Sequence, residues 1–369
     1  MKRAAATLLF SILFRCDSVG PASPASVPAT TVPSATTTAA TAATTTKVRG
    51  MNFAHSLGRR SGGGRGYGSE ASLQSLRSLR SLHVDSIAIT PFGFQRRPDD
   101  TRIIWVGEGD GGRWIDETDD SLRAVITQAH QLGLRVLLKP HLWLRPPDWP
   151  GSIDHATEAE WALWFAEYGK FILHYARLAE SMQVEMLSIG NELTKSTSHE
   201  QPWRDLIAQI RAAYRGKLTY GANMNEVFDV PFWDAVDVIG VSAYFPLNAR
   251  KNPTTDEIAI GWTPIVARLS RLSRRTNRPV LFTELGYTSR DYATAEPWKE
   301  EGGELNLQLQ AEAYQAFFQA VWPQPWFAGV YFWKWESHLN HSTSTDVSFA
   351  IEHKPAEAVV RKHFDLKVK

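Results

Sequence analysis

Residues 184–193 read Val-Glu-Met-Leu-Ser-Ile-Gly-Asn-Glu-Leu. The centre of this segment, 186–189, is a short aliphatic run with the length of a buried strand, and the polar Gly-Asn-Glu follows where the strand would end. A long amphipathic stretch precedes it, which is typical of a helix that leads into a strand of a parallel sheet. The segment therefore predicts one β-strand of an α/β fold, with polar side chains at its carboxyl end.

The same alternation of short β-rich runs and long amphipathic runs recurs from Lys47 to the end of the chain. Eight strands are predicted, at 48–53, 86–90, 135–139, 186–189, 218–221, 238–242, 280–283 and 329–333. Eight strand and helix units in series are typical of a (β/α)8 or TIM barrel, and the span 47–369 is compatible with that fold when its loops are extended. We predict a single α/β barrel domain over 47–369.

Three helix boundaries can be predicted from local signals. Thr157 and Glu160 form a capping box, which predicts that a helix begins there. Thr263 followed by Pro264 predicts a second helix start, because proline suits the first turn of a helix. Gly133 predicts a helix end, since glycine is the residue that most readily follows a last helical turn.

A doubly wound sheet is the alternative fold, because glycines at 62, 63, 64, 66 and 68 follow the first strand. A dinucleotide fingerprint needs glycines at fixed positions that lead directly into a helix, with an acidic residue about 20 positions later. Here Arg65 and Tyr67 interrupt the glycines. The stretch is better interpreted as a loop at the rim of a barrel.

Residues 1–46 differ in composition from the rest of the chain. Residues 1–17 resemble a signal peptide, with Lys2 and Arg3 before an apolar run that is too short to span a bilayer. Residues 18–46, rich in Ala, Ser, Thr and Pro, predict a disordered linker. We expect a secreted or periplasmic protein; lipidation of Cys16, and with it attachment to the cell surface, stays open. No later run is apolar and long enough to predict a transmembrane segment.

The composition excludes several classes of partner and cofactor. The 40 Lys and Arg nearly balance the 39 Asp and Glu, so the chain offers no cationic field for nucleic acid. The single cysteine excludes a disulfide framework and any multi-cysteine metal site. None of the 11 histidines forms a His-x-His or His-Glu-x-x-His motif, and we expect no metal or other cofactor. The oligomeric state stays open.

Two glutamates follow strands of the predicted barrel. Glu192 comes three residues after the predicted end of the fourth strand, and Glu284 comes directly after the seventh. Catalytic residues of TIM barrels lie at the carboxyl ends of the strands, so both side chains are expected at one mouth. A pair of carboxyl groups is what glycoside hydrolysis requires. Either glutamate alone could equally be a solvated loop charge or the partner of an arginine, but the pair favours catalysis.

Six motifs carry a resemblance to a known family: Lys139-Pro140-His141, Gly190-Asn191-Glu192-Leu193, Val241-Ser242-Ala243-Tyr244, Thr283-Glu284-Leu285-Gly286-Tyr287, Pro297-Trp298 and Trp333-Lys334-Trp335. In this order they are similar to glycoside hydrolase family 113, a family of clan A, whose members are retaining (β/α)8 enzymes; its known activity is β-mannanase. The resemblance implies that Glu192 is the acid/base and Glu284 the nucleophile. It also implies that Asn191 binds the sugar 2-hydroxyl and that Tyr244 orients the nucleophile.

Further substrate contacts are expected from neighbouring positions. His141 and Trp143 follow the third strand two residues apart, which predicts that both face the mouth, although a lone histidine is often structural. Trp333 and Trp335 lie at the end of the eighth strand, where an indole can stack on a sugar ring; core packing is the alternative for both. Lys139 could form a Schiff base, but no second signal indicates carbonyl chemistry.

The sequence thus predicts a retaining glycoside hydrolase that acts on a β-linked polysaccharide or oligosaccharide, endo-β-1,4-mannanase-like in substrate. Cellulose, xylan, mixed-linkage glucan and galactan stay open as substrates, as does transglycosylation, because loop details decide specificity. The alternative is a catalytically inactive carbohydrate-binding or structural barrel. Retention of both glutamates together with Asn191 and Tyr244 argues against that alternative.

Overall fold

The computed structural model describes residues 46–55, 66–105, 117–339, 343 and 345–365. The leader predicted at 1–17 lies outside these residues, and so does the linker predicted at 18–46 except for its last residue. Glycines 62, 63 and 64 of the predicted rim loop also lie outside them. Among the helices of the described part of the chain, none is long and apolar enough to cross a membrane.

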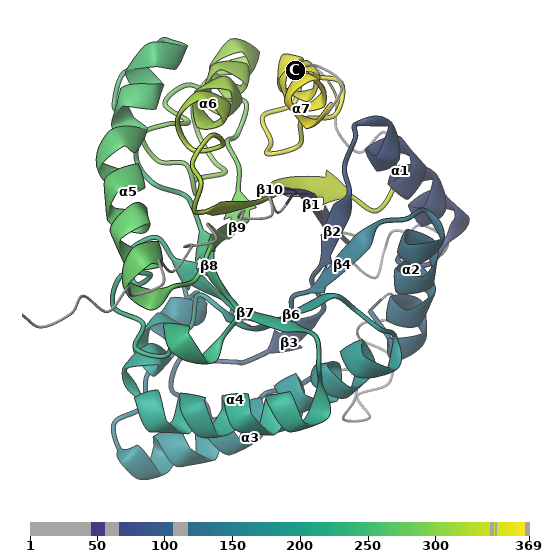
Figure 1. The fold of residues 1–369 in the computed structure, drawn as a ribbon, viewed down its shortest axis with the longest axis vertical. Helices are drawn as coiled ribbons and strands as arrows, with labels where there is room; N and C mark the ends of the chain where they lie inside the picture. Colours follow the sequence, from purple (N-terminus) through teal and green to yellow (C-terminus); the bar gives the residue numbers. More distant parts are fainter. Residues whose placement is uncertain (1–45, 56–65, 106–116, 340–342, 344, 366–369) are drawn as a thin grey trace, which may run out of the picture. The chain divides into compact units, whose positions relative to one another are not determined.

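Eight parallel strands close into a barrel in the order β1, β10, β9, β8, β7, β6, β4, β2 (Figure 1). Their bounds are β1 Val48–Ala54, β2 Ser86–Ile89, β4 Arg135–Leu138, β6 Met186–Asn191, β7 Lys217–Asn223, β8 Val238–Ser242, β9 Val280–Leu285 and β10 Phe327–Glu336. Each one overlaps a predicted strand. The predicted (β/α)8 barrel is confirmed, because buried parallel strands are marked locally by short aliphatic runs.

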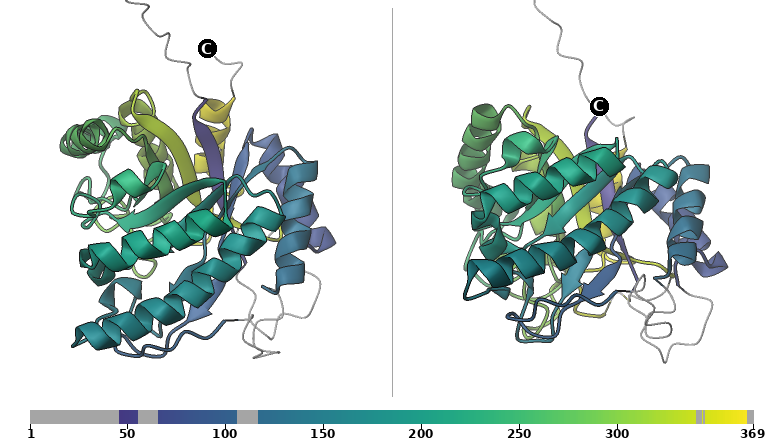
Figure 2. Two further views of the ribbon diagram at one scale, coloured as in Figure 1. Left: turned by 60° about the horizontal axis from the view of Figure 1, so that its bottom comes forward. Right: turned by 90° about the horizontal axis from the view of Figure 1, so that it is seen from below.

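Helices surround the barrel (Figure 2). Among the described residues they are α1 Glu70–Ser81, α2 Asp119–Gln131, α3 Glu158–Ser181, α4 Glu200–Ala213, α5 Thr255–Thr276, α6 Leu307–Ala320 and α7 Pro355–Phe364. Between β7 and β8 only a short 3-10 helix, η4 (Trp233–Ala235), is present, so the fifth of the eight predicted strand and helix units lacks its α-helix. The indole of Trp233 is buried there and donates a hydrogen bond to the carbonyl of Val227 at 2.9 Å.

The three predicted helix boundaries have different outcomes. The capping box of Thr157 and Glu160 begins α3, and Gly133 follows the end of α2 with a φ of +68°, as predicted. Pro264 lies inside α5, which begins nine residues earlier after its own capping box. That prediction is wrong because the earlier cap and the buried side chains of Ile258 and Trp262 carry the helix through the proline.

Strands β3 (Phe92–Phe94) and β5 (His141–Trp143) form a second, two-stranded parallel sheet that the sequence did not predict. β3 begins three residues after β2 ends, and β5 begins three residues after β4 ends. The two neighbouring barrel strands therefore continue, after a short break, beyond the carboxyl end of the barrel. This extension places His141 and Trp143 over the mouth rather than in the barrel wall.

The core has two parts. A large apolar cluster lies between the strands and the helices and contains, for example, Ile87 and Ile89 of β2. A second, small cluster contains Ala88 of the same strand. Since successive side chains of a strand point to opposite faces, this cluster lies inside the barrel. Its buried members are Val48, Ala88, Leu137, Val238, Leu281 and Tyr331.

Candidate active site

Polar side chains from six strands meet at the carboxyl end of the barrel, the face on which TIM barrels carry their active sites. They are Lys139 after β4, Glu192 after β6, Asn223 at the end of β7, Tyr244 after β8, Glu284 in β9 and Trp333 in β10. Glu284 is buried, whereas Glu192 is partly exposed. The two glutamates predicted from strand ends therefore lie at one mouth, as expected.

Glu284 receives hydrogen bonds on both carboxylate oxygens. Lys139 Nζ donates to Oε1 at 2.6 Å, and the Tyr244 hydroxyl donates to Oε2 at 3.0 Å. Burial lowers the pKa of Lys139, although the charge of Glu284 opposes this effect. Burial, together with the charge of Glu284, raises the pKa of Tyr244 well above its usual range, so its hydroxyl stays a donor. A cation and a hydroxyl donor together stabilise a negative charge on Glu284.

Glu192 has the opposite environment. Its carboxylate accepts one hydrogen bond, from Asn223 Nδ2 to Oε1 at 3.2 Å. Burial and the nearby charge of Glu284 raise the pKa of Glu192 to about 8, while the bond from Asn223 acts in the other direction. Glu192 therefore holds its proton at neutral pH. Two carboxyl groups of one site with contrasting environments are the pattern expected of an acid paired with a charged carboxylate.

Lys139 is the partner of Glu284 that sequence analysis missed. Its side chain is completely buried, and besides Glu284 it reaches the carbonyl of Thr283 at 3.4 Å. Asn52 of β1 donates to the same carbonyl at 3.0 Å. Because the amine of Lys139 is paired with Glu284, the ion pair accounts for a buried lysine at this position, and a Schiff base is not needed to explain it.

Two predicted contact residues lie beside this ion pair. The ring of Trp333 lies 5.5 Å from Lys139 Nζ, measured to its centroid, and is parallel to the His141 ring at a centroid distance of 6.5 Å. Burial, with the charge of Lys139, lowers the pKa of His141 well below 6.5, so the ring is neutral. Its buried Nε2 has no hydrogen-bond partner among the described residues. The same holds for the Oδ1 atom of Asn191, whose side chain is buried next to Glu192 in sequence.

The two remaining predicted contacts differ from this group. Trp143 is 40% exposed and stacks on Phe94 of β3 at 5.3 Å, so it forms an aromatic surface on the second sheet. Trp335 is buried in the main core, and its Nε1 donates to Ser75 of α1 at 2.9 Å. The expected sugar contact of Trp335 is corrected here to core packing.

The register of β10 explains why Trp333 and Trp335 differ. Opposite β1, Phe332 pairs with Met51 and Trp335 pairs with Phe53, so β10 contains one extra residue in this interval. An extra residue reverses the alternation of side chains along a strand. Trp333 therefore lies at the mouth and Trp335 outside the barrel. The sequence carries no signal for this irregularity.

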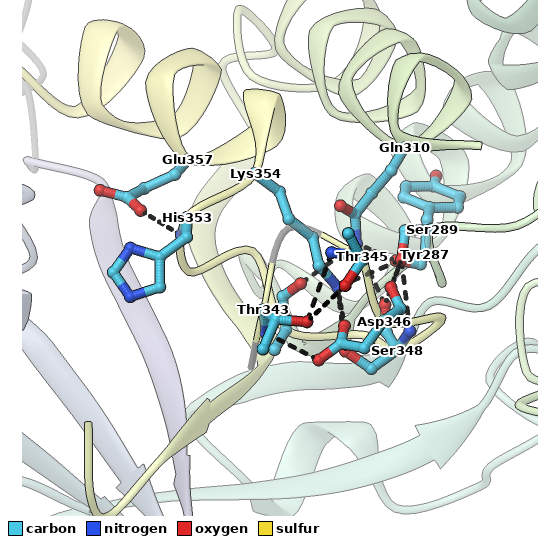
Figure 3. A network of polar contacts seen from close by, with 11 residues as sticks. Tyr287, Ser289, Gln310, Thr343, Thr345, Asp346, Ser348, His353, Lys354 and Glu357 are labelled. Carbon is cyan, nitrogen blue, oxygen red and sulfur yellow. Dashed lines mark hydrogen bonds and ion pairs between the residues drawn. The ribbon is translucent and has the colours of Figure 1, made fainter. Parts of the chain in front are cut away.

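Figure 3 shows a network of polar contacts around Lys354, whose side chain is completely buried. Lys354, just before α7, lies 2.6 Å from Asp346 and donates to Ser289 at 3.1 Å and Ser348 at 3.0 Å. These contacts hold the segment after β10 against the segment after β9. Phe349, next to Ser348, packs edge-on against the Tyr244 ring at 6.1 Å.

Two residues of the site, Asn223 and Glu226, were not predicted from the sequence. Asn223 ends a strand that was predicted to finish two residues earlier, so the strand-end rule with a corrected boundary selects it. Glu226 lies in a turn after that strand and has no sequence signal of its own. In the described part of the chain, no group of three or more His, Cys, Asp or Glu residues could hold a metal ion.

Comparisons with known proteins agree with this geometry. The profile of Glycoside Hydrolase Family 113 matches residues 58–354. No curated protein matches the chain. The GH113 β-mannanase AaManA from Alicyclobacillus acidocaldarius, solved in complex with ManMIm, is 33% identical, with a TM-score of 0.75 over 86% of this chain and 97% of its own.

Two further solved structures are similar. A GH113 β-1,4-mannanase is 27% identical, with a TM-score of 0.76 over 87% of this chain and 99% of its own. A Glycoside Hydrolase Family 5 mannosidase from Rhizomucor miehei is 12% identical, with a TM-score of 0.59 over 87% of this chain and 94% of its own, and shares the fold. With a family match over most of its length and a catalytic-type mouth on a TIM barrel, the chain belongs to Glycoside Hydrolase Family 113 and is a glycoside hydrolase.

Proposed function

We propose that this glycoside hydrolase is a retaining endo-β-1,4-mannanase, with Glu284 as nucleophile and Glu192 as acid/base. The observation that carries the proposal is the contrast between the two carboxyl groups. Glu284 receives a cation and a hydroxyl donor, while the pKa of Glu192 is raised to about 8 by burial and by the charge of Glu284. The substrate class is supported by solved relatives that are β-mannanases.

In the first step of the proposed mechanism, a Glu284 oxygen bonds to the anomeric carbon as the bond from that carbon to the leaving oxygen breaks. The proton of Glu192 goes to the leaving oxygen. Tyr244 and Lys139 hold the two oxygens of Glu284 throughout. Because both donors come from strand ends of a rigid barrel, the carboxylate needs little reorganisation before it attacks.

In the second step, Glu192 removes a proton from water, and the water oxygen displaces Glu284 from the anomeric carbon. The negative charge of Glu284 is one cause of the raised pKa of Glu192. This charge disappears when Glu284 is esterified, so the pKa of Glu192 falls and the residue becomes a base. One group thus serves as acid and then as base.

Substrate contacts are proposed for the predicted residues that lie at the mouth. His141 and Asn191 each have a buried polar atom without a hydrogen-bond partner among the described residues, and a sugar hydroxyl would satisfy either. Trp333 offers an indole face beside the nucleophile's lysine, and the exposed Trp143 offers a second stacking surface farther out.

A substrate panel tests the proposal. The purified protein is incubated with β-mannan, cellulose, xylan, mixed-linkage β-glucan and β-galactan, and products are followed by chromatography and NMR. We expect oligosaccharides of varied length from mannan, with the β anomer formed first. Initial α anomer would contradict a retaining mechanism, and cleavage of another polymer would change the substrate. Tight binding without any product would indicate a carbohydrate-binding barrel.

Two variants test the assigned roles. Glu284→Ala is expected to remove hydrolysis and leave oligosaccharide binding, whereas an unchanged rate would exclude Glu284 as the nucleophile. Glu192→Ala is expected to slow cleavage of poor leaving groups most, because good ones depart without a proton. A uniform loss for all leaving groups would contradict its role as acid.

We also propose that the protein is exported, on the basis of the signal-peptide-like composition of residues 1–17. N-terminal sequencing of protein recovered outside the cytoplasm should begin after this leader. An intact Met1 on protein that stays in the cytoplasm would contradict export.

A further inference from the structure

A third carboxyl group is buried close to Glu192. Glu226 lies three residues after the end of β7 and is 5% exposed. The hydroxyl of Tyr220, from β7 itself, donates to Glu226 Oε1 at 2.7 Å. The same hydroxyl accepts a hydrogen bond from the backbone N–H of Leu193 at 2.8 Å. The Tyr220 hydroxyl thus accepts from the peptide of Leu193 and donates to Glu226, so the two bonds run in one direction.

This chain ends at the peptide that follows Glu192. Glu192 has a φ of +53°, in the left-handed region that a residue with a Cβ adopts at a cost of about 1 kcal/mol. Two bonds enclose this position: Glu192 N–H donates to the carbonyl of Gly221 at 2.8 Å, and Leu193 N–H donates to Tyr220. Both acceptors belong to β7. The strained backbone is therefore fixed on both sides by one neighbouring strand.

The carboxyl group of Glu192 is held by the same segment. The side chain of Asn223, the last residue of β7, donates to Glu192 Oε1, and the backbone carbonyl of Asn223 accepts the backbone N–H of Glu226 at 3.1 Å. Glu226 thus contacts both parts of the support, the tyrosine that holds the backbone and the asparagine that holds the carboxyl group. Nothing in the two-carboxylate mechanism uses Glu226 itself.

We propose that Glu226 is a positioning residue for the acid/base, which it acts on through Tyr220 and the peptide of Leu193. This inference rests on the proposed function, in which Glu192 protonates the leaving oxygen. When Tyr220 loses its acceptor or its hydroxyl, the left-handed turn at Glu192 relaxes and the carboxyl group moves away from the leaving oxygen. The nucleophile, held by Lys139 and Tyr244, stays in place.

The charge of Glu226 also affects the pKa of Glu192. The groups that face Glu192 are Glu284 of β9, Lys139 after β4, and Asn223 and Glu226 at the end of β7. The charge of Glu226 is one of the smaller causes that raise the pKa of Glu192, after burial and Glu284. Burial raises the pKa of Glu226 itself to about 7, against the hydrogen bond from Tyr220. Removal of this charge should therefore lower the pKa of Glu192.

Three variants of the full chain separate position from charge. Tyr220→Phe removes the hydroxyl, Glu226→Leu removes its acceptor, and Glu226→Gln keeps an acceptor oxygen but removes the charge. Tyr214→Phe is the matched control, because the buried Tyr214 hydroxyl also donates one hydrogen bond, to the carbonyl of Val184 at 2.7 Å, before β7 begins. Each variant is compared with wild type by kcat and KM on 2,4-dinitrophenyl β-mannobioside, a good leaving group, and on mannotetraose, a poor one.

We expect Tyr220→Phe and Glu226→Leu to lower kcat/KM on mannotetraose at least tenfold and kcat/KM on the dinitrophenyl substrate less than threefold. The comparison uses kcat/KM because this ratio reports the first step, in which only the poor leaving group needs the proton of Glu192. Glu226→Gln should stay near wild type at pH 6, with the alkaline limb of its kcat/KM profile moved to lower pH. Tyr214→Phe should lose thermal stability without any dependence on leaving group.

Equal losses on both substrates in folded Tyr220→Phe would reduce the tyrosine to a structural role and overturn the proposal. An unmoved alkaline limb in Glu226→Gln would overturn its electrostatic part. Glu192→Ala, measured in parallel, distinguishes the two levels of inference. If Glu192→Ala shows no leaving-group dependence, the acid assignment itself fails. If Glu192→Ala shows leaving-group dependence and the Tyr220 and Glu226 variants show none, only the positioning role of Glu226 fails.

Discussion

Replacement of Glu192 by Gln is expected to stabilise the protein, by an amount that increases with pH. The pKa of this carboxyl group is raised from 4.5 to about 8 by burial and by the charge of Glu284. Between these two values the unfolded chain has released the proton and the folded chain has kept it. The free energy of unfolding of the wild type therefore falls as pH rises through this interval. Gln has the same shape and does not titrate.

The magnitude follows from the two pKa values. Each pH unit costs about 1.4 kcal/mol in the middle of the interval and less near either pKa value, so between pH 5 and pH 8 the wild type loses roughly 3 kcal/mol that the Gln variant keeps. Because Glu192 is partly exposed, its charged form retains some hydration and this value is an upper bound. For a chain of this size, 3 kcal/mol corresponds to about 5 °C in melting temperature. Gln keeps the acceptor oxygen for Asn223, so no hydrogen bond is lost.

The assay is calorimetry of both proteins at pH 5, 6, 7 and 8. The difference in melting temperature should grow steadily with pH. Glu284→Gln is the contrasting variant, because it leaves the completely buried Lys139 without its countercharge and should destabilise by about 3 kcal/mol. A Glu192→Gln difference that is constant or shrinks with pH would refute the raised pKa. Stabilisation by Glu284→Gln would refute the different environments of the two carboxyl groups.

Three further outcomes are expected. The kcat/KM profile should fall tenfold per pH unit above about pH 8, where Glu192 loses its proton, and a profile flat to pH 10 would contradict this role. Gly286→Ala should cost about 2 kcal/mol in urea unfolding, because its Cβ would lie 2.3 Å from the backbone oxygen of Trp333, and an unchanged midpoint would count against that close approach. Asp346→Asn should cost about 3 kcal/mol by leaving the completely buried Lys354 without its countercharge, and adding Lys354→Met should recover part of the loss; no recovery would contradict the ion pair as its cause.

The strands and both glutamates could be predicted because their signals are local. A parallel strand buried on both faces is a short aliphatic run, and polar residues at its carboxyl end lie at the mouth of the barrel. The helix ends at Thr157 and Gly133 depend on equally local capping chemistry. A local signal fails when a stronger one lies nearby: Pro264 predicted a helix start, but the capping box of Thr254 and Glu257 begins α5 earlier in the chain.

Contacts between distant parts of the chain were beyond sequence reasoning. Lys139 and Glu284 are 145 positions apart, and only closure of the barrel brings β4 and β9 into reach of one another. The extra residue in β10, which separates Trp333 from Trp335, depends on pairing with β1. The short 3-10 helix η4, which stands in place of an α-helix between β7 and β8, also has no signal in the strand pattern that predicted the barrel.

The buried ion pair of Lys139 and Glu284 has a consequence for the whole catalytic cycle proposed above. Before reaction, the lysine is positive, Glu284 is negative and Glu192 is neutral, so the three groups sum to zero. In the glycosyl-enzyme, Glu284 is an uncharged ester and Glu192 has given up its proton, so the sum is again zero. Creation of net charge in a poorly hydrated interior is costly. The lysine makes each half-reaction a transfer of negative charge between two glutamates around a fixed positive centre.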